Sequence, residues 1–339
     1  MTKSSTSIEI RDLYKIFGST PKAHVEAVRQ GMTKAELSEK HGHILGLNNI
    51  NISIPAGKIQ VIMGLSGSGK STLIRHINRL IEPTSGAIMI DGRDILSMSP
   101  DDLREFRRTG TAMVFQKFAL LPHRTVLDNV IFGLEVRGQD KAKSRDSAMR
   151  WIERVGLNGF ESRYPSELSG GMKQRVGIAR ALTNNASILL MDEAYSALDP
   201  LIRTDMQTML LDLQKELGKT VVFITHDLDE ALRLGDGIVI LRDGSIVQKG
   251  NSQEILLKPA DDYIQRFVKD VNRGRYIRVA SVMGDGVPAD AGLPRIKGSA
   301  TLEEAVKLLS DAGAQAALVT DAAGQPTGQV TLRNLMDAL

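Results

Sequence analysis

The residues most able to do chemistry lie in a glycine-rich segment in the first quarter of the chain. Residues 64–72 read G-L-S-G-S-G-K-S-T, which matches the pattern G-x-x-x-x-G-K-S. In this pattern the glycines let the backbone curl around phosphates, Lys70 reaches the terminal phosphates, and the hydroxyl of Ser71 can ligate Mg²⁺. The sequence therefore predicts a nucleoside triphosphate site formed by Gly64, Leu65, Ser66, Gly67, Ser68, Gly69, Lys70, Ser71 and Thr72.

More polar residues follow in an order that narrows the type of site. A glutamine ends Val-Phe-Gln at 114–116, and the motif Leu-Ser-Gly-Gly occupies 168–171. Apolar runs at 188–191 and 220–225 then end in an Asp-Glu pair and in a histidine. Carboxylates just after a strand can hold a cation or polarise water. The candidate site residues in these motifs and just after them are Gln116, Ser169, Gly170, Gly171, Asp192, Glu193, Ser196, Asp199 and His226.

The elements that must position these residues are strands and helices of an α/β fold. An apolar run at 59–63 precedes the glycine-rich loop and a helix-like stretch follows it. The continuous apolar character of 188–191 and 220–225 suits parallel strands that are covered on both faces. Residues 33–36 have the spacing Thr-x-x-Glu, which predicts a short helix over about 33–41.

Together these motifs resemble the ATP-binding-cassette (ABC) family of P-loop ATPases. The Leu-Ser-Gly-Gly motif just upstream of an apolar strand ending in Asp-Glu carries the resemblance. An insertion between Phe17 and Leu47, together with the segments 61–70, 79–84 and 170–175, is similar to the ATPase subunit of glycine betaine/proline importers. This likeness runs from about residue 8 to the end of the sequence. It implies a P-loop NTPase nucleotide-binding domain with a RecA-like core, an antiparallel β subdomain and a helical subdomain.

The resemblance also implies roles for single residues. The adenine of ATP would stack on Phe17, with Tyr14 as a possible substitute and a core position as the alternative for Phe17. Ser71, Gln116 and Asp192 would hold Mg²⁺. Glu193 would act as general base, and His226 would contact the terminal phosphate. In a homodimer the site would be completed in trans by Ser169, Gly170 and Gly171 of the second copy, with Ser196 and Asp199 forming the D-loop.

The expected domain organisation has three parts. Residues 1–250 form the cassette, with an insertion at about 18–45 and the helical subdomain at about 117–173; residues 251–276 form a helical connector. Residues 277–339 are similar to a single CBS repeat, a small α/β unit. Relatives usually carry two such repeats in tandem, so we expect the repeats of two copies to pair across a dimer.

Composition sets limits on the function. The chain of 339 residues has a net charge of +3, a pI near 9.0, 4% aromatic residues and no cysteine. These values exclude disulfides and Cys-based zinc sites, and they disfavour a nucleic-acid partner. The sequence has no run of eighteen apolar residues that could span a membrane. We therefore expect a peripheral subunit at the cytoplasmic face of the inner membrane. It would need transmembrane permease subunits and, indirectly, a periplasmic or extracellular substrate-binding protein.

The favoured function is ATP hydrolysis that powers import of glycine betaine, proline betaine or a related quaternary amine. The alternatives are the same role for choline, trimethylamine N-oxide or histidine, a non-transport ABC ATPase, and a free regulatory nucleotide sensor. Apart from His226, the histidines are expected to be surface or packing residues. A metal site at His41 and His43 lacks an evident third ligand; the remaining histidines are His24, His76 and His123.

Overall fold

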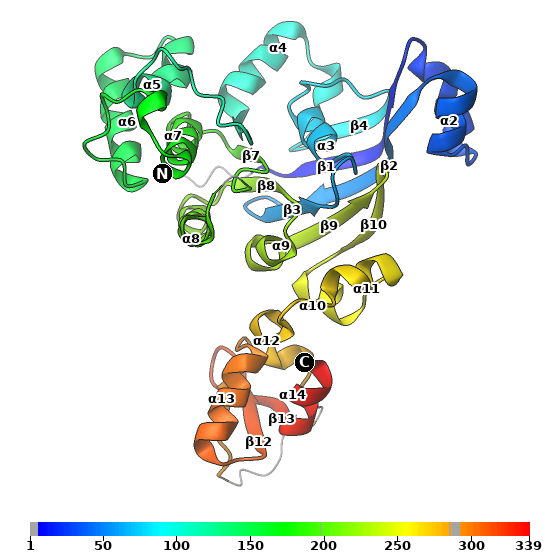
Figure 1. Cartoon of the computed structure of the whole chain (residues 1–339), viewed down its shortest axis with the longest axis vertical. Coiled ribbons are helices and arrows are strands. Elements are labelled where there is room, and N and C mark those ends of the chain that lie inside the picture. Colours follow the sequence, from blue (N-terminus) through cyan, green and yellow to red (C-terminus); the bar gives the residue numbers. More distant parts are fainter. Residues whose placement is uncertain (1–5, 197, 285, 287–291) are drawn as a thin grey trace. The chain divides into compact units, whose positions relative to one another are not determined.

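The structure is a computed structural model that describes residues 6–196, 198–284, 286 and 292–339 (Figure 1). The described chain forms two compact units. The first contains residues up to Asp227 together with Val239–Val247, and the second contains Leu228–Ile238 together with Gln248–Leu339. The boundaries expected at residues 250 and 276 stay predictions. Positions 1–5, 197, 285 and 287–291, which fall within the expected cassette and CBS-like repeat, lie outside the described residues.

A mostly parallel sheet forms the centre of the first unit. Its strand order is β10-β9-β3-β8-β7-β6, and β3, β8, β7 and β6 run parallel. Every residue of β3, β7 and β8 is buried, as expected for parallel strands covered on both faces. The strands predicted from the apolar runs are thus confirmed. The bounds are β3 Ile59–Met63, β6 Thr111–Val114, β7 Ile188–Asp192, β8 Thr220–Thr225, β9 Gly237–Arg242 and β10 Ser245–Gly250.

An antiparallel sheet with the order β2-β1-β4-β5 covers the core (Figure 1). Strand β1 lies in its interior, where Ile8 and Ile10 pair with isoleucines of β2 on one side and of β4 on the other. These side chains are buried in one apolar cluster with Ile62 of β3 and Leu73 of the helix that follows it. The predicted antiparallel β subdomain is therefore present. Its strands are β1 Ile8–Phe17, β2 Ile44–Ile54, β4 Ser85–Ile90 and β5 Arg93–Asp94.

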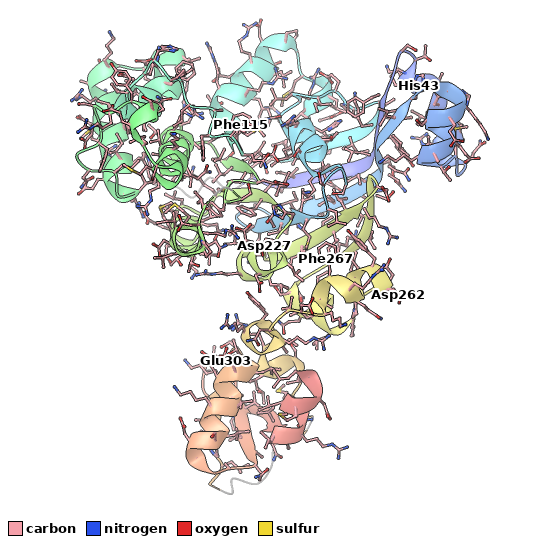
Figure 2. The ribbon with its side chains drawn as sticks, in the orientation of Figure 1. His43, Phe115, Asp227, Asp262, Phe267 and Glu303 are labelled. Atoms are coloured by element: carbon pink, nitrogen blue, oxygen red, sulfur yellow. The ribbon has the colours of Figure 1, made fainter. Side chains whose placement is uncertain are left out.

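The inserted segment between β1 and β2 contains two short helices, α1 (Val25–Arg29) and α2 (Lys34–His41). Thr33 caps α2: its hydroxyl accepts from the backbone N–H of Glu36, and the Glu36 carboxylate accepts from the backbone N–H of Thr33. This reciprocal capping box confirms the helix predicted from the Thr-x-x-Glu spacing. In Figure 2 the labelled His43 lies in this segment, close to where the chain rejoins β2.

The helical subdomain is built from α5 (Val126–Val136), α6 (Lys141–Arg154) and the start of α7 (Gly170–Thr183). Residues 117–125, expected to be helical, are not. Thr125 instead caps α5 by accepting from the backbone N–H of Asp128. The other α-helices of the first unit are α3 Lys70–Ile77, α4 Pro100–Glu105 and α8 Pro200–Leu217. Short 3₁₀-helices cover Pro21–His24, Ile95–Ser97 and Pro165–Glu167, and a π-helical turn covers Phe106–Gly110.

The second unit combines connecting helices with a small α/β unit. Strand β12 pairs in parallel with β11 and antiparallel with β13. The element order α13, β12, β13, α14 agrees with the small C-terminal α/β unit that was expected. The CBS assignment stays a prediction. The bounds are α9 Leu228–Leu234, α10 Ser252–Leu257, α11 Asp262–Val268, α12 Arg273–Tyr276, a 3₁₀ turn Val279–Ser281, β11 Arg295–Lys297, α13 Leu302–Ala312, β12 Ala316–Thr320, β13 Pro326–Thr331 and α14 Leu332–Ala338.

Candidate functional site

The glycine-rich loop joins the carboxyl end of β3, an interior strand of the parallel sheet, to α3. Gly64, Gly67 and Gly69 have φ values of 149°, 78° and 102°. A Cβ atom at Gly64 would lie 2.3 Å from the carbonyl oxygen of Leu241 on β9. Glycine is therefore required here, because any larger residue would collide with the backbone of the neighbouring strand.

The turn between β9 and β10 supports this loop. The backbone N–H of Gly244 donates to the carbonyl oxygen of Ser68 over 3.1 Å, and the N–H of Asn48 donates to the carbonyl oxygen of Gly244 over 2.8 Å. A Cβ atom at Gly69 would lie 2.9 Å from the carbonyl oxygen of Gly46. The loop conformation is thus fixed by close backbone contacts from two other parts of the chain.

Lys70, the first residue of α3, is only 5% exposed. Its Nζ donates to the carbonyl oxygens of Gly64 (2.8 Å) and Leu65 (3.1 Å) and lies 3.6 Å from Oε1 of Glu193. The ammonium group is thereby held over the loop by acceptors that satisfy it at this buried position. The glycine-rich pattern predicts that a lysine at this position binds the terminal phosphates of a nucleotide.

Asp192, the last residue of β7, joins the loop helix to the sheet. Its Oδ1 accepts from the hydroxyl of Ser71 over 2.8 Å, and its Oδ2 lies 3.4 Å from a guanidinium nitrogen of Arg75. Asp192 is 4% exposed, so these two partners stabilise its buried charge. A hydroxyl and a carboxylate in contact form a set of oxygen donors suited to Mg²⁺.

Glu193 lies next to Asp192 with a φ of 45°, an uncommon conformation outside glycine. Its backbone N–H donates to the carbonyl oxygen of Ile224 on β8 over 3.1 Å. Its Oε2 accepts from the amide nitrogen of Gln116 over 2.9 Å and lies 3.6 Å from Nδ1 of His226. The strained backbone therefore directs one carboxylate toward the cationic and amide groups of three other segments.

His226 follows the end of β8 and its side chain is 56% exposed. Its neighbour Asp227, labelled in Figure 2, forms an ion pair with Arg203 at 3.2 Å. The N–H of Asp227 donates to the hydroxyl of Thr225 over 2.9 Å. These contacts fix the turn that carries the imidazole of His226 beside Glu193.

A cavity of about 400 Å³ lies beside the glycine-rich loop. Phe17, 38% exposed, forms part of its wall, with Nζ of Lys15 at 4.9 Å from the ring centroid. Phe17 is therefore an accessible ring and not a core residue. The lining residues are Phe17, Lys34, Ile44, Leu45, Gly46, Ser66, Gly67, Ser68, Gly69, Lys70, Ser71, Thr72, Gln116 and Glu193.

The predicted signature residues lie at the start of α7 and do not line this cavity. Ser169 caps the helix, with its hydroxyl accepting from the N–H of Met172 over 3.3 Å, and Gly170 and Gly171 form the first turn. Of the predicted D-loop residues, Ser196 donates its hydroxyl to the carbonyl oxygen of Glu193 over 3.0 Å, whereas Asp199 is the N-cap residue of α8.

Several residues of the site were missed by the motif reasoning. Arg75, which pairs with Asp192, and Lys34 and Ile44 of the cavity wall belong to no motif of the loop. For Arg75 its place one helical turn beyond Ser71 was the available signal; for Lys34 and Ile44 there was none. Among the described residues, no group of three or more His, Cys, Asp or Glu side chains could hold a metal ion.

Comparison with known proteins agrees with this geometry. The ABC transporter family model matches residues 47–196. The glycine betaine transport ATP-binding protein OpuAA of Bacillus subtilis is 54% identical over 291 residues, which cover 85% of this chain and 69% of that protein. The chain belongs to the ABC transporter ATPase family. As an ABC transporter ATPase it has the P-loop NTPase fold of that family and binds ATP.

Two further relatives extend the comparison. The trimethylamine N-oxide transport system ATP-binding protein TmoW of Ruegeria pomeroyi is 44% identical over 340 residues, 99% of this ABC transporter ATPase and 97% of that protein. A solved dimeric ATP-binding cassette with bound ADP and phosphate is 33% identical to this chain, with a TM-score of 0.62. The alignment covers 72% of this chain and 98% of the solved one. In the described part of the ABC transporter ATPase, no helix combines the length and apolar character needed to cross a bilayer.

Proposed function

We propose that this chain is the ATP-hydrolysing subunit of an importer for glycine betaine, proline betaine or a related quaternary amine. The ATPase part rests on one observation: Lys70, Gln116 and His226 all lie within 3.6 Å of the Glu193 carboxylate beside the glycine-rich loop. The cargo class is supported by the 54% identity to the glycine betaine protein of Bacillus subtilis.

In this proposal the nucleotide occupies the cavity beside the loop. The exposed ring of Phe17 stacks on adenine, and the backbone N–H groups of residues 64–72, at the start of α3, face the phosphates. Lys70 is already oriented by the carbonyl oxygens of Gly64 and Leu65. Its ammonium therefore needs little reorganisation to bind the terminal phosphates.

The oxygen donors of Ser71 in α3, Asp192 at the end of β7 and Gln116 after β6 fit a magnesium ion. The hydroxyl of Ser71 and a carboxylate oxygen of Asp192 are 2.8 Å apart. The amide nitrogen of Gln116 is engaged by Glu193, so its amide oxygen is the atom available to a cation. Bound there, Mg²⁺ would neutralise charge on the β- and γ-phosphates. Arg75 would help to hold the Asp192 carboxylate in place, since a guanidinium nitrogen lies 3.4 Å from its Oδ2.

Glu193 is proposed as the general base. Its carboxylate takes a proton from a water molecule as the water oxygen attacks the γ-phosphorus and the bond to the ADP oxygen breaks. His226, 3.6 Å from the carboxylate, orients the water and contacts the γ-phosphate. Phosphoryl transfer needs mainly such positioning and charge stabilisation, so no covalent intermediate on the protein is required.

A second copy of the chain would complete the site. Ser169, Gly170 and Gly171 begin α7 but do not line the cavity of their own chain, so their donors are available to the nucleotide of a partner copy. The relative solved as a dimer with ADP and phosphate supports this arrangement. Ser196 and Asp199 would lie at the dimer contact. The dimer would bind permease subunits at the cytoplasmic membrane face, and the permease would receive cargo from a substrate-binding protein.

One alternative cargo has direct support. The TmoW relative, named for trimethylamine N-oxide, matches 99% of the chain. Trimethylamine N-oxide and betaines share a quaternary nitrogen, and the cargo itself would contact the permease and binding protein. The ATPase site described above is the same under both cargoes. Measurements of transport are therefore needed to distinguish the two cargoes.

The test is uptake of labelled glycine betaine by cells that express this chain with its permease and binding-protein partners. Trimethylamine N-oxide, choline, proline betaine and histidine serve as unlabelled competitors and, in parallel assays, as labelled substrates, and the Glu193→Gln variant serves as the comparison. Uptake that requires Glu193 and is competed by betaines supports the proposal. Uptake of trimethylamine N-oxide alone would move the cargo to the alternative, and no Glu193-dependent uptake of any of them would refute the quaternary-amine assignment.

A further inference from the structure

The insertion between β1 and β2 begins and ends at the apolar side of the cavity. Phe17, the last residue of β1, is the register partner of Ile44, the first residue of β2. Both line the cavity, and they are 38% and 58% exposed. Because the chain leaves the sheet after one of these residues and returns at the other, the inserted helices are anchored at the rim of the nucleotide site.

The insertion is also firmly packed. Leu37 of α2 is fully buried in a cluster with Val25 and Val28 of α1 and with Tyr14 and Ile16 of β1. Burial of these apolar side chains away from water stabilises the packing of α1 and α2 against β1. The position of α2 relative to β1 and to the cavity is therefore fixed by a core of its own.

The first turn of α2 is fixed a second time by its cap. The Glu36 carboxylate accepts from the backbone N–H of Thr33 over 3.0 Å and from its hydroxyl over 2.9 Å, and Lys40 lies 3.2 Å from it. These contacts lower the pKa of Glu36 to about 2. Lys34, the first residue of the helix, thus starts from a backbone position that the capping box and Leu37 hold in place.

Lys34 itself belongs to the cavity wall. Its Nζ lies 3.7 Å from Oδ1 of Asp243, and the two side chains are 43% and 76% exposed. Asp243 precedes Gly244, whose N–H supports the loop at Ser68. An ion pair this exposed contributes little, because water competes for both partners. The ammonium can therefore exchange Asp243 for another acceptor in the cavity at small cost.

We propose that Lys34 is a nucleotide-binding residue contributed by the insertion. When ATP occupies the cavity, the ammonium leaves Asp243 and donates to oxygen atoms of the ribose or the α-phosphate. Lys70 serves the terminal phosphates, so Lys34 would supply the cation at the opposite, nucleoside end beside Phe17. The inference rests on the proposed function, because it assumes that the cavity binds ATP. It gives the insertion a role in setting nucleotide affinity.

The test measures the Kd values of ATP and ADP for the full chain by isothermal titration calorimetry. Lys34→Met should raise both values about tenfold, as expected for losing a charge-assisted hydrogen bond, and Lys34→Arg should restore most of the affinity. Both nucleotides should be affected equally, because they share the ribose and the α-phosphate. Lys22→Met is the matched control: it removes another exposed lysine from the insertion, one that neither lines the cavity nor contacts the cap of α2, and it should leave both Kd values unchanged.

The outcomes are separable. Parental Kd values in Lys34→Met, an equal rise in Lys22→Met, or a rise for ATP without one for ADP would each overturn the role of Lys34. Lys70→Ala tests the underlying site, and it should abolish measurable ATP binding. If Lys70→Ala instead binds ATP like the parent, the proposed function fails, and the assignment of Lys34 falls with it.

Discussion

Replacing Glu193 by glutamine is the sharpest test of the catalytic assignment. The change keeps the shape of the side chain and one oxygen acceptor, so the amide nitrogen of Gln116, now 2.9 Å from Oε2, keeps a partner. Lys70 loses a carboxylate at 3.6 Å but keeps the carbonyl oxygens of Gly64 and Leu65. The variant should therefore bind ATP nearly as well as the parent.

What the variant loses is the basicity of the carboxylate. A positioned general base contributes about 10²- to 10⁴-fold to a rate, which corresponds to about 2.7–5.4 kcal/mol of activation free energy. We expect kcat for phosphate release to fall by that factor while the Kd for ATP changes less than about threefold. Because hydrolysis no longer separates the copies, an ATP-bound dimer should accumulate.

The assay combines phosphate release at saturating Mg²⁺ and ATP with gel filtration in ATP and a nucleotide-binding titration. Glu193→Asp serves as a control that keeps a carboxylate but shortens its reach, and it should retain more activity than the glutamine variant. Hydrolysis by Glu193→Gln at the parental rate would refute the role of Glu193 as base. A loss of ATP binding in place of a loss of kcat would show that this carboxylate acts on binding.

Three further predictions follow from the geometry around the loop. Gly64→Ala should lower the Tm and weaken ATP binding, because its Cβ would lie 2.3 Å from the Leu241 carbonyl oxygen; Gly138→Ala, which also has positive φ (68°) but no heavy atom within 4 Å of the added Cβ, should show a smaller loss in both measurements. Ser169→Arg should reduce kcat and the ATP-induced dimer in gel filtration while leaving the Kd for ATP unchanged. Burial lowers the pKa of His76 from 6.5 to about 4, so the unfolded chain binds more protons between these values, and the free energy of unfolding should fall by about 2 kcal/mol from pH 7 to pH 5; urea unfolding should show that His76→Asn, which can still donate to the Thr72 carbonyl oxygen, lacks this loss.

Much of the fold and the order of the motifs could be predicted from the sequence because the signals are local. The apolar runs that became β7 and β8 need no distant partner to be recognised, and the Thr33-x-x-Glu36 spacing describes contacts within one helical turn. The glycine-rich loop is likewise a single continuous segment. The roles of its residues, and those of Glu193 and His226, stay predictions.

The remaining features depend on tertiary structure. Arg75 and Asp192 are far apart in the sequence and meet only because α3 packs against β7. Lys34 reaches the cavity only because Leu37 buries α2 against β1. Residues 117–125 were expected to be helical, but the left-handed backbone of Phe118 and Ala119 and the cap at Thr125 place the first helix later. None of these contacts follows from spacing or periodicity.

The hydrogen bond from Gln116 to Glu193 also bears on how the rate of ATP hydrolysis is controlled. A hydrogen bond to a charged acceptor contributes about 1.5–3 kcal/mol. A change of about 1.36 kcal/mol in activation free energy changes a rate tenfold. Gln116 thereby links the loop after β6, over 2.9 Å, to the residue proposed as the general base. We therefore expect a shift of that loop to change the rate of ATP hydrolysis.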